Sequence, residues 1–330
     1  TTAHQFDNDE QLGGGWRHDV LNDAAYACLL EAAANGTWDA MMVAEDCATY
    51  TSARFFDASN GDGDPGPPPV RTKTHPDGLP ESQLDPRHAA ELRNANKRLR
   101  RTVDICIAAF KSSKRTTIIF ENPADYSNPD EAQYAADLHD HGSIFGTSEF
   151  LRLKAAIQPA SMSTFAACKF GLDARKYTTL FYTNDAASVL APLDKPNFKC
   201  DHPSGTHTKA GGRNADSSWA SARYAAYTPA LITRLAMAFT CARTGDPRPI
   251  SQQDLPAPPA APAHHTPPGD SPPTYGPSPD PGAFYSIPGG VPLAPASAVP
   301  PSPRPAPASP SSAASPIPFA GFPTPSAAVG

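Results

Sequence analysis

The alternation of hydrophobic and polar positions divides the first 245 residues into helices and short strands. Apolar residues at helical spacing predict helices over residues 24–34, 85–110, 148–157 and 228–242. Short apolar runs predict strands over residues 40–44 and 116–120, and two more between residues 162 and 184. Strands that alternate with helices indicate an α/β fold, so we expect a Rossmann-like, mostly parallel sheet with helices on both faces.

Two segments lack such a pattern. Residues 60–83 carry too many glycines and prolines for a regular element and predict a long surface loop. After Gly245 the chain is mainly Pro, Ala and Ser, and more than half of its 40 prolines lie there. Such a composition buries too little apolar surface to offset the entropy lost on ordering. We therefore expect one folded domain over residues 1–245 and a disordered, Pro-rich tail over residues 246–330 that is available to bind other proteins.

Charge and cysteine content limit the classes of partner. A net charge of -6 argues against a generally basic protein that coats nucleic acid. The helix over residues 85–110 still has a basic stretch, either a solvated face or a local contact for DNA phosphates. Six dispersed cysteines lack the dense spacing of a small secreted scaffold, so we expect reduced thiols and an intracellular protein. No apolar run is long enough for a membrane span, and no membrane partner is expected.

Two predicted strands end on residue types that carry chemistry. Cys47 follows the strand over residues 40–44, and Glu121 and Asn122 end the strand over residues 116–120. Taken singly, each has an ordinary structural explanation, since a buried cysteine behaves as a small hydrophobe. In doubly wound sheets, however, ligands bind outside the carboxyl ends of the strands. We therefore expect the two strands to be parallel neighbours, with Cys47 and Glu121 within roughly 10 Å of each other in one crevice.

The order of these segments over about residues 18 to 240 resembles the cytosine-5 DNA methyltransferases. Cys47 matches the nucleophilic cysteine of that family, and Glu121-Asn122 match its base-holding Glu-Asn pair. The stretch from Phe170-Gly171 to Lys176 matches a Tyr-Gly segment that leads into a strand with basic side chains. The resemblance thus implies Cys47, Glu121, Asn122, Arg175 and Lys176 as catalytic residues, and Asp19 and Val20 as contacts of the cofactor.

This resemblance implies transfer of a methyl group from S-adenosylmethionine to a cytosine flipped out of DNA, with the Cys47 thiolate adding to C6 of the base. A DNA substrate would place the protein in the nucleus. The chain is also similar to degenerate methyltransferase-like segments of algal and oomycete transposable-element polyproteins, through Glu121-Asn122-Pro123 and Arg175-Lys176. That similarity implies an alternative, a non-catalytic interaction or structural segment of a mobile-element polyprotein.

Three departures from the family's pattern concern the cofactor, the thiol and the target. The glycine-rich turn that would hold S-adenosylmethionine is missing, so we expect this chain by itself to bind it weakly or not at all. Asp46 replaces the family's proline, and the Glu45-Asp46 pair disfavours a thiolate at Cys47. Between Asn184 and Tyr224 there are only about 40 residues for target recognition, so we expect no sequence-specific reading of DNA.

One further group of residues has metal-binding chemistry. Cys200, His202 and His207 are close in the sequence, and Cys168 is available as a fourth ligand. Their spacing fits no standard zinc template, and we assign no metal site from the sequence.

Overall fold

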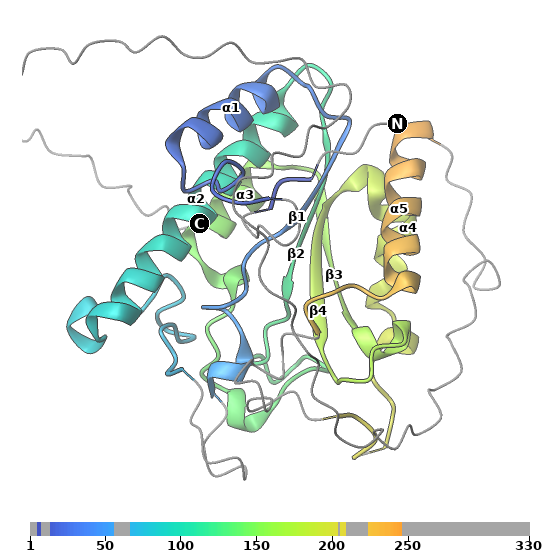
Figure 1. Cartoon of the computed structure of the whole chain (residues 1–330). Helices are drawn as coiled ribbons and strands as arrows, with labels where there is room; N and C mark the ends of the chain where they lie inside the picture. The colour runs from blue at the N-terminus through green and yellow to red at the C-terminus, as the bar shows by residue number, and fades with distance from the viewer. Residues whose placement is uncertain (1–4, 8–13, 56–66, 204, 209–223, 246–330) are drawn as a thin grey trace, which may run out of the picture. The chain divides into compact units, whose positions relative to one another are not determined.

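The computed structural model of the chain describes residues 5–7, 14–55, 67–203, 205–208 and 224–245 (Figure 1). All of them belong to one unit, over residues 1–266, and a second unit over residues 267–330 lies outside the described residues. The tail that the composition predicts to be disordered, residues 246–330, likewise lies outside them.

The described strands form one mixed sheet in the order β1-β2-β4-β3. They are β1 (Ala40–Ala44), β2 (Thr117–Pro123), β3 (Ala160–Ala166) and β4 (Tyr177–Thr183). β1 and β2 are parallel, whereas β4 is antiparallel to both β2 and β3. An α/β fold is therefore confirmed, but the described sheet is mixed, with one parallel and two antiparallel pairs, and not clearly the mostly parallel sheet that was expected. The connection over residues 167–176 is too short for the crossover that parallel pairing of β3 and β4 would need.

The described helices include the four that the sequence predicts and a short one, Ala187–Leu190, that it does not predict. They are α1 (Asp23–Ala34), α2 (Pro86–Lys111), α3 (Ser148–Ala156), α4 (Ala187–Leu190) and α5 (Pro229–Thr244). The side chains of Asp85 and Thr228 accept hydrogen bonds from the first turns of α2 and α5, and a proline follows each of them at the first helical position. None of the helices among the described residues is long and apolar enough to cross a membrane.

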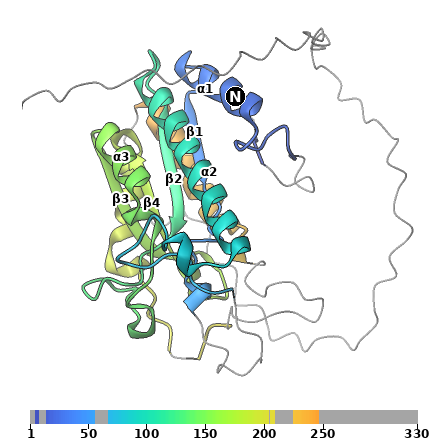
Figure 2. The same cartoon turned by 90° about the vertical axis from the view of Figure 1, so that its left-hand side faces the viewer.

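The helices cover both faces of the sheet, as expected (Figures 1 and 2). Side chains of β2 alternate between the faces. Phe120 packs with residues of α2 and α3, whereas Ile119 packs with Leu231 and Leu235 of α5. α1 packs on α2 through Leu29. The carboxyl ends of β1 and β2 are thus held between a layer containing α1, α2 and α3 and a layer containing α4 and α5.

The predicted surface loop packs into the domain over the part that is described, residues 67–83. Val70 and Arg71 are fully buried there. The Arg71 guanidinium lies 4.0 Å from the centre of the Tyr50 ring and donates hydrogen bonds to Thr49 Oγ1 and the Pro76 carbonyl. Because these contacts satisfy a buried cation, the loop holds the segment that follows Cys47 in place.

Candidate active site at the ends of β1 and β2

β1 and β2 bring Cys47 and Glu121 to the same edge of the sheet. The strands are parallel neighbours, with Ala44 opposite Glu121, which confirms that they are adjacent. The charges of Glu121 and Lys176 both shift the pKa of the Cys47 thiol. Cys47 in turn contributes to the raised pKa of Tyr227. We call Cys47, Glu121, Lys176 and Tyr227 the strand-end cluster.

Glu121 is a nearly buried carboxyl, only 6% exposed. Its Oε2 accepts a hydrogen bond of 2.8 Å from the Tyr227 hydroxyl, and its Oε1 has no hydrogen-bond partner among the described residues. Burial raises the pKa of Glu121, while the Lys176 charge and the Tyr227 hydrogen bond oppose this rise. Glu121 therefore keeps its proton to higher pH than an ordinary glutamate.

Cys47 is half-buried beside this carboxyl. Burial raises the pKa of its thiol, the positive charge of Lys176 opposes the rise, and the negative charges of Asp46 and Glu121 add to it. Asp46 itself forms an ion pair of 2.8 Å with Arg98 of α2. For Asp46, the expectation that the Glu45-Asp46 pair disfavours the thiolate agrees with the direction of this pKa shift. Lys176 is the charged group that favours the thiolate.

Asn122 lies on the other face of β2 from Glu121, because successive side chains of a strand alternate. It is fully buried, and its Nδ2 donates a hydrogen bond of 3.0 Å to the Glu45 carbonyl. Its Oδ1 has no partner among the described residues. Asn122 thus ties β2 to the segment that carries Cys47 and does not share the Glu121 face.

Glu45 is a second buried carboxyl, located just after β1. Burial raises its pKa to about 7, although a hydrogen bond with Thr102 and the charge of Arg98 lower it. Both of these partners belong to α2. Glu45 is therefore a pH-sensitive contact between the Cys47 segment and α2.

Of the two basic residues that precede β4, only Lys176 belongs to the cluster. Its Nζ donates a hydrogen bond of 3.2 Å to the Tyr224 carbonyl, and its charge lowers the pKa values of Cys47 and Glu121. Lys176 and Tyr227 also line one small hollow. Arg175 is exposed, and its guanidinium lies 5.8 Å from the centre of the Tyr177 ring.

Asp19 and Val20 lie in the segment before α1, and Val20 joins that segment to α2. The Asp19 carboxylate accepts a hydrogen bond of 2.8 Å from the Leu21 N–H, and the Val20 carbonyl accepts one of 2.8 Å from Arg101. Gly15, in the glycine run near them, donates its N–H to the Asp7 carbonyl and is not followed directly by a helix. These residues do not fit an S-adenosylmethionine site, because their polar groups are used within the chain and no glycine turn joins a strand to a helix among the described residues there.

The basic stretch of α2 is largely paired with acids of the same chain. Its ion pairs are Arg93 with Glu81, Lys97 and Arg101 with Asp23, and Arg98 with Asp46. These contacts reduce the charge that this helix face offers to phosphates.

Sequence reasoning missed Tyr227. Its position immediately before Thr228, the N-cap of α5, is the only local signal, and that position does not indicate a contact with Glu121. The two residues are 106 positions apart, so only the packing of α5 on the sheet brings them together.

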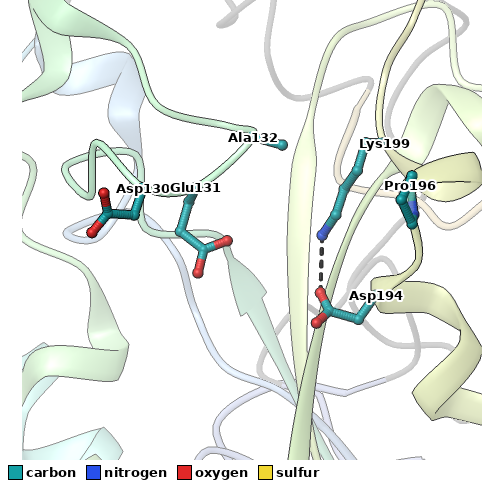
Figure 3. Close-up of a pocket in the computed structure, with 6 residues that line it drawn as sticks. All are labelled: Asp130, Glu131, Ala132, Asp194, Pro196 and Lys199. Atoms are coloured by element: carbon teal, nitrogen blue, oxygen red, sulfur yellow. Dashed lines mark hydrogen bonds and ion pairs between the residues drawn. The ribbon is translucent and has the colours of Figure 1, made fainter.

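Two other places on the domain gather polar side chains. One is an open hollow lined by Asp130, Glu131, Ala132, Asp194, Pro196 and Lys199, where Lys199 pairs with Asp194 at 2.9 Å (Figure 3). It shares no residue with the strand-end cluster. The other brings together the four candidate metal ligands, Cys168, Cys200, His202 and His207.

Comparison of the chain with protein-family models, curated proteins and solved structures finds no match. Function is therefore inferred from the chain's own residues.

Proposed function

We propose that this chain is a cytosine-5 DNA methyltransferase-like domain of Rossmann-like fold, whose strand-end cluster holds an extruded cytosine beside the Cys47 thiol. One observation carries the proposal: at the same edge of two parallel, adjacent strands lie Cys47, three residues after β1, and the buried carboxyl of Glu121, near the end of β2. The mixed sheet is compatible with it, since β4 alone runs opposite to its neighbours β2 and β3, and mixed sheets are common in α/β folds. In such folds the ligand binds outside the strand ends.

The environment of Glu121 suits a group that donates a proton to the base. Burial raises the pKa of Glu121, and in its protonated form this carboxyl can donate a hydrogen bond to ring N3 of cytosine, which makes C6 more electrophilic. Tyr227 holds Oε2, whereas Oε1 has no partner among the described residues. A buried polar atom without a partner calls for an explanation, and the edge of a bound base supplies one.

The covalent step needs only groups of this cluster and the base. The Cys47 thiolate attacks C6 and forms the S–C6 bond. The C5=C6 electron pair shifts to form a C4=C5 double bond, the C4=N3 pair moves onto N3, and N3 takes the proton of Glu121, which is left as a carboxylate. Lys176 increases the thiolate fraction, since its charge lowers the pKa of Cys47. Asn122 is a positioning residue, because it holds the Glu45 backbone and through it the segment leading to Cys47.

The residues around Asp19 do not fit the methyl donor, so the proposal extends to the covalent step and no methyl-transfer step is assigned to them. We expect calorimetric titration of the full chain with S-adenosylmethionine to give a dissociation constant weaker than about 10 μM, equivalent to about 7 kcal/mol of binding free energy. A tighter constant would show that the cofactor is held by other residues.

Addition of the thiol can be tested without a methyl donor. The full chain is incubated with a DNA duplex carrying one mismatched 5-azacytosine, a base that is easily extruded and electrophilic at C6. We expect an adduct at Cys47, detected by mass spectrometry, which Cys47→Ser abolishes and Glu121→Ala slows by about a hundredfold or more. The control is Cys28→Ser, at an exposed thiol on α1. Absence of the adduct from the folded wild-type chain would refute the proposal.

A second candidate function is a non-catalytic segment of a mobile-element polyprotein. It is favoured by the raised pKa of Cys47 and by the lack of fit around Asp19. In that case the wild-type chain and Cys47→Ser would give the same result, no adduct, even at about pH 9, where a thiol of ordinary pKa is ionised.

A further inference from the structure

The four candidate metal ligands come from two segments that are distant in the sequence. Cys168 lies in the single turn over Ala167–Phe170 that follows β3. Cys200, His202 and His207 lie in the loop after Pro196–Phe198. Their ligand atoms all lie within 4.8 Å of one another. Three of the four ligands are close in the sequence, and folding brings Cys168 to them to complete a Cys2His2 set.

The distances within this set suit a tetrahedral zinc ion. Cys200 Sγ lies 3.1 Å from His207 Nε2 and 3.7 Å from His202 Nδ1. Zinc–sulfur bonds of about 2.3 Å and zinc–nitrogen bonds of about 2.1 Å place tetrahedral ligands roughly 3.3 to 3.8 Å apart. The wider pairs, up to 4.8 Å, need side-chain shifts of about 1 Å to close around an ion.

The backbone around the set is held by contacts that need no ion. The Tyr177 hydroxyl accepts a hydrogen bond of 3.0 Å from the Cys200 N–H. At the other end of the loop, the Thr208 N–H donates one of 3.0 Å to the Asp173 carbonyl. An ion pair between Lys169 and Asp201 joins the two segments directly. Because these contacts already hold Cys200, Asp201 and Thr208, less chain entropy would be lost when a metal binds.

We propose that Cys168, Cys200, His202 and His207 form a structural zinc site. Two thiolates and two imidazoles are ligands that zinc accepts in structural sites, and four protein ligands leave no open position for catalysis. The ion joins loop residues 199–203 and 205–208 to the connection between β3 and β4. That connection ends at Lys176 of the strand-end cluster. A zinc ion bound here would therefore help to fix the position of Lys176 without being part of the cluster.

Metal content of the purified full chain tests this proposal. We expect about one zinc ion per chain, with loss of most of it in Cys200→Ser and in His207→Ala. Matched controls are Cys28→Ser, at an exposed thiol, and His139→Ala, at an exposed imidazole that contacts the nearby Ala136 carbonyl. Both controls should keep the full zinc content. Zinc retained by Cys200→Ser and His207→Ala would overturn the proposal.

Cobalt substitution keeps the test independent of whether the variants fold. In the reduced wild-type chain, Co²⁺ should give the intense visible bands of a tetrahedral site together with a thiolate-to-cobalt charge-transfer band. Added zinc should remove both bands, and a chelator should lower the midpoint of thermal unfolding. A chain without zinc and without these cobalt bands, or one with a Cys168–Cys200 disulfide under reducing conditions, would overturn it.

Discussion

The Tyr227 hydroxyl donates a hydrogen bond of 2.8 Å to Glu121 Oε2, and this bond joins the start of α5 to the carboxyl end of β2. Glu121 is nearly buried, so the bond satisfies one oxygen of a carboxyl that has little access to water. It also limits the rise in the pKa of Glu121 that burial causes.

Removing this hydroxyl should destabilise the domain. We expect Tyr227→Phe to lower the free energy of unfolding by about 1–3 kcal/mol, because it leaves a buried carboxyl oxygen unsatisfied. Urea denaturation would measure the change. The matched control is Tyr134→Phe, at a tyrosine that is 36% exposed, where the effect should stay within about 0.5 kcal/mol. Equal stabilities of Tyr227→Phe and wild type would show that this hydrogen bond does not hold α5 to β2.

Opposite charges near Cys47 should change its reactivity in opposite directions. Lys176→Gln removes the charge that lowers the thiol pKa, and Asp46→Asn removes one that raises it. We expect alkylation of Cys47 by iodoacetamide to become about threefold or more slower in the first variant and faster in the second. Mass spectrometry of the modified peptides follows each thiol, and the exposed Cys28 provides an internal control. Changes in the same direction would mean that the charges do not act on this thiol.

The stability of the domain should decrease with pH because of Glu45. Its pKa is about 7 when folded, above the value of 4.5 for an unperturbed glutamate, so the folded state binds more protons between these values. Its stabilising contribution is complete below about pH 4.5 and is lost as the pH rises through about 7, at a cost of about 3 kcal/mol.

Glu45→Gln should remove this dependence. The variant should gain stability relative to wild type between about pH 5 and about pH 8, as measured by urea denaturation at both values. Glu31→Gln, at an exposed position of α1, is the control and should follow the wild-type curve. If the variant keeps the full pH dependence of the wild type, other groups cause that dependence.

Gly142 leaves room for the segment that carries Arg71. A Cβ at this position would lie 2.8 Å from both Arg71 Cβ and the Thr72 nitrogen, so Gly142→Ala should cost about 1–3 kcal/mol of stability. At Gly146 the nearest atom, Pro76 Cβ, would be 3.4 Å away, and Gly146→Ala should change stability by less than about 1 kcal/mol. Thermal unfolding would compare the two variants. Similar midpoints would show that the backbone near Arg71 can move aside.

The local pattern of the sequence was sufficient for the long helices and for the four strands, but not for the short helix α4. Helix starts at Asp85-Pro86 and Thr228-Pro229 and the apolar strand before Glu121 depend on neighbouring residues, and the structure confirms them. The pairing of β1 with β2 could also be predicted, because the helix α2 between them is long enough for a parallel crossover.

Contacts between distant residues were decided only by the tertiary structure. Alternation along β2 places Glu121 and Asn122 on opposite faces of the sheet. The packing of α5 on the sheet brings Tyr227 into contact with Glu121. The antiparallel pairing of β4 follows from the length of one connection, and the meeting of Cys168 with Cys200 follows from that pairing and the loop after it. Hydrophobic periodicity determines which residues form an element and which of its faces is buried. It does not determine which buried faces meet, because that choice depends on packing the whole chain at once.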